Sequence, residues 1–414
     1  MTPISTARLG RNVIALSVVS FLTDASSEII APLLPLFLVG TLGASVSMVG
    51  VIEGSAETVA SLIKLLSGWW SDRLVRRKPL IVAGYAIASL VRPLVAIATS
   101  ASQVLAIRLT DRVGKGIRGA PRDALLAASC PPDQRGRVFG VHRAADHAGA
   151  VVGPLVALFC LQWLMLPVRQ VFWVAAVPGV LAVLVAVLFV REAALERAEA
   201  PADLADLAAP AAAEHARSDA RSAPLPAGFW RALAPILLFT LGNSTDAFLL
   251  LRASSLGVPT PFIPVLWMVL HVVKSAASVP GGALSDRLGR RPLIVAGWLV
   301  YAAVYGGFAV ATTAWHVWLL FALYGVMFGL TEGAEKALVA DLVPAARRGV
   351  AFGWYHATIG IAALPASVLF GVVWDRYGAP SAFAMGAALA LSAALLLMVM
   401  LPRDRGAPAP AVSV

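Results

Sequence analysis

Residues 68–85 read GWWSDRLVRRKPLIVAGY, and residues 282–298 read GALSDRLGRRPLIVAGW. The two stretches align with a single gap. A second pair stands at equivalent places, since PPDQRGRVFGVH at 131–142 answers PAARRGVAFGWY at 344–355. Two separate matches in the same order predict that a unit of roughly half the chain has been duplicated.

The regions around both repeats are strongly apolar. The chain has 414 residues, of which 59% are hydrophobic and 14% charged, and its mean hydropathy is +0.81. This composition excludes an arrangement of soluble domains. A membrane helix needs about 20 mostly apolar residues. The sequence therefore predicts an all-α integral membrane protein with twelve spans, at residues 12–38, 47–70, 79–100, 102–128, 136–162, 170–190, 230–252, 262–284, 291–313, 315–341, 349–373 and 380–401.

The net charge of +10 follows the order of these spans. Arg and Lys gather in the connections after even-numbered spans, while the connections after spans 1, 3 and 9 carry neither. The positive-inside rule then places both termini and all the basic connections in the cytoplasm. The excess charge records topology, so it does not indicate a nucleic-acid partner.

One long segment breaks the apolar pattern. Residues 191–229 are rich in Ala, Pro and charge, which predicts a cytoplasmic linker. The linker divides the chain into a six-helix unit at 1–190 and a second one at 230–414. Parallel repeats of this kind, related by an axis along the membrane normal, are typical of transporters whose substrate site lies at the midplane between the halves.

The repeated motif resembles that of the major facilitator superfamily, and the resemblance covers essentially the full chain. The family carries G-x-x-x-D-R-x-G-R-R between its second and third spans, often echoed between the eighth and ninth. The first copy has Val75 where the second glycine belongs. The resemblance implies a cluster that holds the cytoplasmic side shut, and the alternative is a topology signal only. The matching residues are Gly68, Asp72, Arg73, Arg76 and Arg77 in the first copy, and Gly282, Asp286, Arg287, Gly289, Arg290 and Arg291 in the second.

Span 5 contains Gly149-x-x-x-Gly153-Pro154, which looks like the G-x-x-x-G-P motif of the family's proton-coupled exporters. The usual trailing Gly-Gly pair is absent here. Small residues at i and i+4 let helices pack closely, so ordinary helix packing is the alternative. The stretches LTDRVGKGIRGAPRDALLA at 109–127 and TEGAEKALVAD at 331–341 are similar to a branch of putative permeases, which implies a mechanism class rather than a substrate.

Charged residues recur inside the predicted spans. Asp24 and Glu28 share one face of span 1, because residues four apart are neighbours on a helix. Charges at this depth are costly unless they pair or line water. Two carboxylates in a low-dielectric site favour protonation of one of them, so we expect Asp24, Glu28 or both to carry the proton. The alternative is that arginines of span 4 pair with them permanently.

Two further acidic sites are candidates for proton handling. Asp146 with His147 in span 5 is the second choice, and Asp246 in span 7 is the expected counterpart of Asp24. The resemblance implies that spans 1, 4, 7 and 10 line a central cavity. These are four of the spans that carry the most charge.

Span 4 carries a cationic stripe, in which Arg112, Lys115, Arg118 and Arg122 recur every three or four residues. Such a stripe suits an organic anion, through charge-assisted hydrogen bonds. Glycines 114, 116 and 119 with Pro121 are expected to loosen this helix and to expose backbone groups.

The repeat alignment also predicts a gate. It sets Arg122 and Asp123 opposite Glu335 and Lys336, with the order of charge reversed. We expect these pairs, with Glu332 nearby, to bind crosswise at the cytoplasmic end and to separate when the cavity opens inward. The alternative is that both pairs sit at the membrane surface.

Taken together, these features predict a proton-coupled secondary transporter of the bacterial inner membrane that moves a small organic solute by alternating access. Export by proton antiport is favoured over uptake by symport, and a non-transporting sensor or assembly protein is a further alternative. The motifs H-E-x-x-H and G-x-S-x-G are absent, and the His and Cys residues do not cluster at ligand spacing. We expect a monomer in the bilayer, with no enzymatic activity, cofactor or metal.

Overall fold

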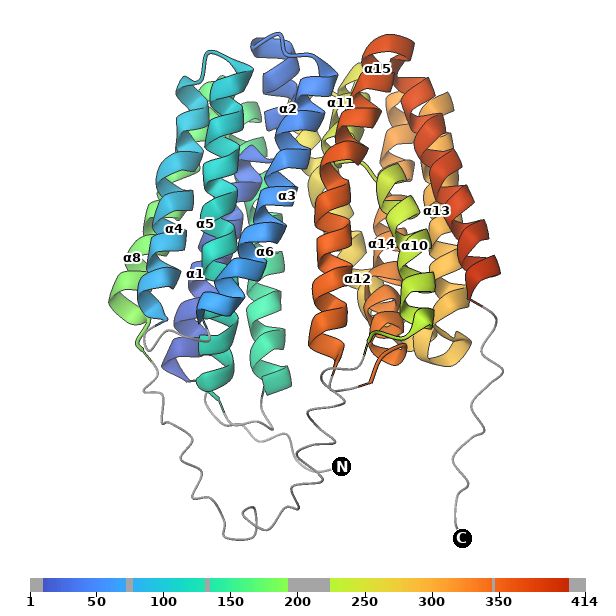
Figure 1. Ribbon diagram of the computed structural model, residues 1–414. Helices are drawn as coiled ribbons and strands as arrows, with labels where there is room; N and C mark the ends of the chain where they lie inside the picture. The colour runs from blue at the N-terminus through green and yellow to red at the C-terminus, as the bar shows by residue number, and fades with distance from the viewer. Residues whose placement is uncertain (1–9, 72–76, 131–134, 193–223, 345–346, 402–414) are drawn as a thin grey trace, which may run out of the picture.

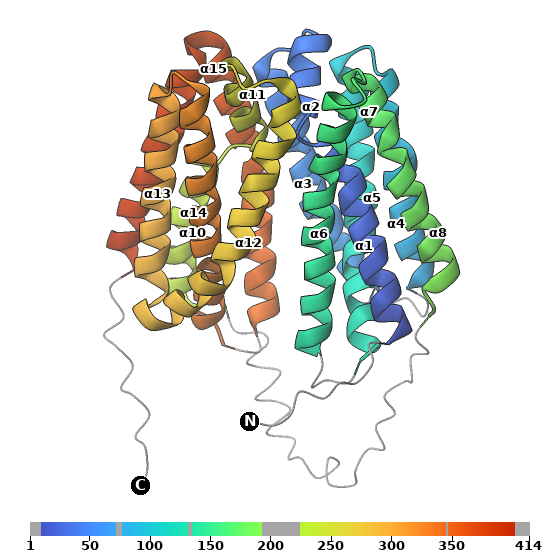
Figure 2. The same cartoon turned by 180° about the vertical axis from the view of Figure 1, so that it is seen from behind.

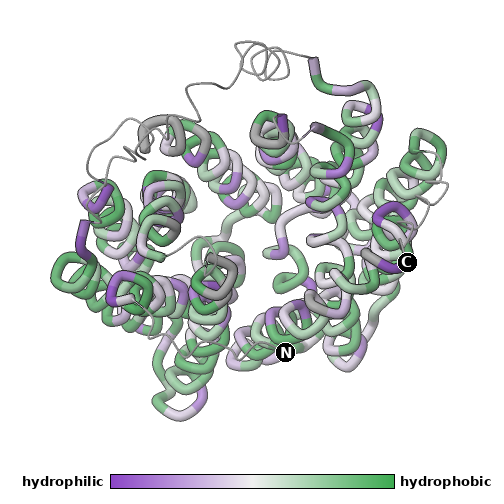
Figure 3. The backbone as a smooth tube through the Cα atoms, turned by 90° about the horizontal axis from the view of Figure 1, so that it is seen from below, coloured by the Kyte–Doolittle hydropathy of each residue, from purple (hydrophilic) through white to green (hydrophobic). Residues whose placement is uncertain are grey.

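The computed structural model describes residues 10–71, 77–130, 135–192, 224–344 and 347–401. All the regular structure in these ranges is helical. The helices stand side by side in two groups, one from each half of the chain (Figures 1 and 2). Figure 3 looks along the helix axes and shows the same two groups around a common centre.

The first group, called here the N-bundle, contains six spans. Two of them continue through a change of helix type, because α1 is followed by a short helix and a π-helical turn, and α4 ends in a 3-10 segment. The elements are α1 (Arg11–Ile30), α2 (Leu34–Leu36) and η1 (Phe37–Thr41), α3 (Val46–Ser71), α4 (Lys78–Val91) and η2 (Arg92–Ile97), α5 (Ala101–Ala128), α6 (Arg135–Gln162), and α7 (Val168–Val174) with α8 (Ala176–Phe189).

The second group, the C-bundle, is built in the same way. Gly378 interrupts α15 with φ 83° and ψ 166°, a backbone conformation that glycine adopts readily, so that α15 is two antiparallel spans. The elements are α10 (Ala227–Gly242) and α11 (Ala247–Ser255), η4 (Thr260–Phe262) and α12 (Ile263–Leu288), α13 (Arg290–Val310), α14 (Ala314–Asp341) and α15 (Arg348–Met400).

The predicted twelve spans are confirmed. Ten described helical stretches are long and apolar enough to cross a membrane. One of these ten, α15, contributes two spans across its bend. The twelfth is α5, which carries too much charge to count among the ten, yet its 28 residues extend about 42 Å at 1.5 Å per residue. The boundaries of the two units and of their linker stay a prediction, since residues 193–223 lie outside the described ranges.

The bundles meet along two pairs of helices, α3 with α15 and α6 with α12. Small residues let the backbones approach closely there. A Cβ on Gly54 would lie 2.8 Å from the Cα of Leu364, and one on Gly371 would lie 2.5 Å from the Cα of Ser47. Thr58 Oγ1 donates to the carbonyl of Gly360 over 2.6 Å. The central space between the bundles is thus flanked by two close helix contacts.

The two bundle interiors differ in chemistry. The C-bundle is filled by stacked aromatic side chains, among them Phe239 on Trp298, with ring centroids 4.6 Å apart, and Tyr301 on Tyr305 at 4.1 Å. The N-bundle instead buries charged groups such as Arg92 and Asp111. The charges that the sequence placed within spans are therefore concentrated on one side of the molecule.

Candidate functional site

A cavity of about 660 Å³ lies between the bundles and is called the central cavity below. Its N-bundle wall is charged, while the C-bundle wall supplies mostly hydroxyl, amide, aromatic and aliphatic groups. The charged residues that line it are Asp24, Glu28, Glu53, Glu57, Arg92, Arg108, Asp111, Arg112, Lys115, Arg118, Arg143, Asp146, His147, Asp246, His271 and Lys274. Helices α1, α5, α10–α11 and α14 all contribute, in accord with the expectation for spans 1, 4, 7 and 10.

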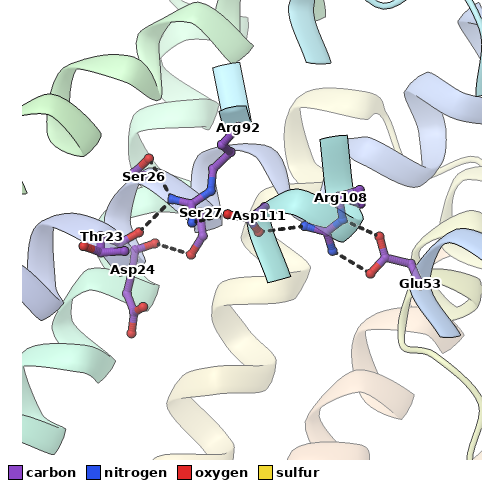
Figure 4. Close-up of polar contacts among 8 residues, drawn as sticks. All are labelled: Thr23, Asp24, Ser26, Ser27, Glu53, Arg92, Arg108 and Asp111. Atoms are coloured by element: carbon purple, nitrogen blue, oxygen red, sulfur yellow. Dashed lines mark hydrogen bonds and ion pairs between the residues drawn. The ribbon is translucent and has the colours of Figure 1, made fainter. Parts of the chain in front are cut away.

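One end of the charged wall is a closed ionic network (Figure 4). Arg108 holds Glu53 with two hydrogen bonds, of 3.0 Å from Nε and 2.6 Å from Nη2. Arg92 Nη2 pairs with Asp111 Oδ1 over 2.8 Å, and its Nη1 donates to Thr23 O and to the Ser26 hydroxyl. These contacts join η2 to α1 and α5, and α5 to α3. Their charges are satisfied within the N-bundle, so we assign them to its architecture.

The predicted cationic stripe divides into two parts. Arg112, Lys115 and Arg118 line the central cavity, and no ion pair within 4.0 Å joins any of them to a described carboxylate. Arg118 is 5% exposed, lies 4.3 Å over the Tyr85 ring, and leaves its Nη1 without a hydrogen bond. Arg122 is not among the lining residues, because it pairs with Asp123 over 2.9 Å.

The expected loosening of α5 is wrong. The helix runs unbroken through Pro121, and two of its glycines are packing contacts. A Cβ on Gly114 would lie 2.7 Å from the carbonyl of Gly84 on α4, and Gly116 fits against Ile63 on α3. The carbonyl of Gly116 accepts a hydrogen bond from Ser67 instead of facing the cavity. The glycines allow α5 to sit deep between its neighbours.

Asp24 and Glu28 both line the central cavity, on adjacent turns of α1. The exporter-like motif of α6 packs directly against them. A Cβ on Gly149 would meet the carbonyl of Phe21 and the Asp24 side chain, and one on Gly153 would lie 2.7 Å from Glu28 Cβ. In this structure no described Lys or Arg nitrogen lies within 4.0 Å of either carboxylate, so the expected alternative of permanent ion pairs is not formed here.

Glu28 has a partner that the sequence did not suggest. Trp267 of α12 donates its indole Nε1–H to Glu28 Oε2 over 2.5 Å. The two residues are 239 positions apart and belong to different bundles. An indole inside a predicted span was the available signal, because a buried Trp N–H usually finds an acceptor.

The other proton candidates also have specific partners. Ser20 donates to Asp146, and His142, one turn before Asp146, places its Nε2 3.9 Å from the same carboxylate. His142 is thus the histidine beside Asp146, while His147 lines the central cavity. Asp246 follows the break between α10 and α11 and accepts a hydrogen bond of 2.7 Å from Tyr324.

The residues predicted to form a gate are held within their own bundles in this conformation. Glu332 accepts from Lys336 over 3.0 Å and from Lys274 over 3.2 Å. Glu335 is 9% exposed and accepts from Trp298 Nε1 and the Tyr355 hydroxyl, each over 3.0 Å. The crosswise pairing with Arg122 and Asp123 is not formed here and stays a prediction for another conformation.

Most of the second copy of the repeated motif lies at the junction of α12 and α13. Gly282 has open space at its Cβ position, and the close helix contact is made by Gly281, which packs on the Gly329 backbone. Gly289 has φ 90° at the junction of α12 and α13, which favours glycine there. Arg291 donates to the carbonyl of Met398. Arg287 is exposed. The side chain of Asp286 lies outside the described set, as do Asp72 and Arg73 of the first copy. Gly68 of the first copy lies within α3.

Comparison with known proteins identifies the family to which this arrangement belongs. The sequence model of the Major Facilitator Superfamily matches residues 16–273 and 253–413. The chain is 32% identical over 399 residues to the uncharacterized MFS-type transporter MJ1317 of Methanocaldococcus jannaschii, covering 94% of this chain and 95% of the relative. A shorter match, 37% identical over 95 residues and 23% of this chain (24% of the relative), is to the multidrug resistance protein MdtH of Cronobacter sakazakii.

A solved structure has the same architecture. The crystal structure of the nucleoside transporter NupG superposes with a TM-score of 0.74 over 94% of this chain and 98% of its own, at 15% identity, a likeness of fold. The family match, the full-length relative and the fold agree with the duplicated motif and the twelve spans. The chain is a multi-pass membrane transporter that belongs to the Major Facilitator Superfamily.

Proposed function

We propose that this protein is a proton-coupled secondary transporter that exports a small organic anion from the bacterial cytoplasm by alternating access. The observation that carries the proposal is the central cavity, which brings cations without carboxylate partners and carboxylates without cationic partners into one space. Arg112, Lys115 and Arg118 bind the anionic group of the substrate, and Asp24 with Glu28 carries the proton. The apolar body of the substrate rests against Trp267 and Phe328 of the opposite wall.

Export by antiport is supported by the exporter-like motif at Gly149 and Gly153 and by the local likeness to a multidrug resistance protein. In this scheme an outward-to-inward step with protons and a return step with substrate alternate through the same cavity.

The proposed setting is the inner membrane, with a monomer whose termini and 191–229 linker face the cytoplasm. This orientation rests on the distribution of Lys and Arg between the connections.

The test begins with binding. The purified protein is screened by thermal shift against organic anions and cations at pH 6 and pH 8. A ligand at a hundred times its Kd stabilises the folded state by about 2.7 kcal/mol. We expect hits among anions that are lost in Arg118→Ala and Arg112→Ala and retained in Arg231→Ala, which removes an exposed cation outside the cavity. Hits among cations that vanish in Asp24→Asn would overturn the anion assignment.

A second experiment fixes the direction. Proteoliposomes loaded with the best anion are placed in an imposed pH gradient, and substrate movement is followed. Antiport predicts that substrate moves against the inward flow of protons. Movement with the protons would establish a symporter, and binding without counterflow would establish a sensor.

A further inference from the structure

We propose that Trp267 is a coupling residue, which ties the C-bundle to Glu28 of the N-bundle while that carboxylate is ionised and releases it when the carboxylate takes up a proton. This inference rests on the proposed proton coupling and adds to it the contact through which the charge state of α1 reaches the other bundle. Trp267 is a positioning residue, because it acts through Glu28.

The geometry of the contact is specific. The indole Nε1 lies 2.5 Å from Glu28 Oε2, and this hydrogen bond directly joins α12 to α1. Glu28 has no described ion-pair partner within 4.0 Å that could replace this donor. Both residues line the central cavity, so the contact stands where substrate passes.

Each end of the contact is held by its own bundle. On the N-bundle side, a Cβ placed on Gly153 of α6 would lie 2.7 Å from Glu28 Cβ. Helices α1 and α6 are therefore in close contact at Glu28. On the C-bundle side, the Trp267 ring meets His271 edge-on, with centroids 4.9 Å apart. The hydrogen bond therefore joins two side chains that each pack against a neighbour in their own bundle.

The strength of the contact depends on charge. A hydrogen bond from N–H to a carboxylate is shorter and roughly twice as strong as one between neutral groups. Protonation of Glu28 therefore weakens the link between the bundles. For the usual range of neutral and charge-assisted bonds, this changes the ratio of two bundle arrangements by about five- to tenfold.

Other ionisable groups surround Glu28, so its proton uptake reflects all of them. They come from its own helix, from η2 and α5, from α6, and from α12, and they are Asp24; Arg92, Arg108, Arg112 and Lys115; Asp146 and His147; and His271 and Lys274. None of these supplies the link to the C-bundle that Trp267 supplies. A variant that removes only the indole N–H therefore measures how much this hydrogen bond contributes to the pH response.

The test measures the distance between bundles as a function of pH, without using transport. Spin labels replace Ala128 at the end of α5 and Leu288 at the end of α12, both exposed, in a Cys130→Ser/Cys160→Ala background. Pulsed electron-spin distance measurements are made from pH 5 to pH 8 on the unmodified site, Trp267→Phe, Glu28→Gln and the double variant. Trp163→Phe, which changes a 65% exposed tryptophan, is the matched control.

We expect the ratio of the two distance populations to change with pH in the parent protein and in Trp163→Phe. Trp267→Phe should reduce that change by about five- to tenfold, and the double variant should resemble Glu28→Gln alone. A Trp267→Phe protein whose pH response equals the parent's would overturn the inference, even if proton-driven transport is established. If the protein transports nothing but its pH response still depends on Trp267, the proposed function is rejected and the coupling role of Trp267 is supported.

A second variant guards against misfolding of Trp267→Phe. Glu28→Asp keeps a carboxylate but shortens its reach by one methylene, so it breaks the contact while leaving the indole in place. It should show the same reduced pH response as Trp267→Phe. A parent-like response in Glu28→Asp would likewise overturn the inference.

Discussion

The carboxylate of Asp375 accepts a hydrogen bond from the backbone N–H of Ser47 over 2.8 Å, and a second from the N–H of Val46 over 3.0 Å. Asp375 lies in α15, next to the Gly378 bend, and the two N–H groups belong to the first turn of α3. A carboxylate at a helix N-terminus satisfies unpaired donors and complements the helix dipole. This one does so across the two bundles, close to the bend of α15, which is drawn at the upper end of the molecule in Figure 1.

Asp375→Ala should loosen that end. Because the contact exists only while α3 and α15 are together there, its loss favours the arrangement in which this end opens. Ser367 lines the central cavity and is 2% exposed, so a cysteine introduced by Ser367→Cys reports whether this end has opened. We expect its modification by a membrane-impermeant thiol reagent, added on the Asp375 side, to be several-fold faster. Arg376→Ala, which changes the exposed neighbour, serves as control. Equal rates in both variants would mean that Asp375 does not hold this end closed.

Replacing glycine by alanine should lower stability at the contact of α6 with α1 but not at a glycine that has open space beside it. Gly149→Ala and Gly153→Ala place a methyl group against the α1 backbone, and overpacking of this kind costs about 1–3 kcal/mol. Gly353→Ala in α15 meets no atom within 4 Å, so the higher helix propensity of alanine should leave its stability unchanged or raised. Thermal unfolding in detergent measures all three. Unchanged melting of Gly153→Ala would contradict the packing role.

The Arg108–Glu53 pair should behave as a structural unit. Glu53→Gln leaves Arg108 as a buried charge with a weaker acceptor, and loss of one partner of a buried pair costs about 3–5 kcal/mol. Replacing both residues by Gln should cost much less than the sum of the single changes. A double-mutant cycle on the free energy of unfolding measures this coupling. Additive effects would show that the two side chains act independently.

Glu335 offers a test of how a buried carboxylate is satisfied. Its described donors, Trp298 and Tyr355, are neutral and bind different oxygens of the carboxylate. In a glutamine the amide oxygen can accept from Trp298, and the amide nitrogen can donate to the Tyr355 hydroxyl. Glu335→Gln should therefore be close to neutral in stability. Glu335→Ala should cost more, because it leaves two buried donors unsatisfied at about 1–3 kcal/mol each. Denaturant unfolding compares the two variants, and a Gln variant as unstable as the Ala variant would show that the negative charge itself is required.

Much of the fold could be predicted from the sequence because its signals are local. Long apolar runs gave the twelve spans, and spacing of four residues placed Asp24 and Glu28 together in the cavity. The partners of these carboxylates could not be predicted in the same way. Trp267 and Tyr324 lie 239 and 78 positions from the acids they contact, and in sequence they resemble any core aromatic residue. The helix contact beside the second motif copy could not be read from the motif either, since it is made by Gly281, one residue before the motif begins.

The charge on α5 has a consequence for how the chain is made. Each Arg, Lys or Asp at the centre of a lone helix costs about 2.5–3.5 kcal/mol on insertion into the bilayer. The ion-pair partners of α5 are Glu53 on α3 and Arg92 on η2, and both emerge from the ribosome before α5 does. The residues that neutralise charge on α5 are therefore already synthesised when α5 is made. The order of synthesis is thus compatible with insertion of this helix beside its partners.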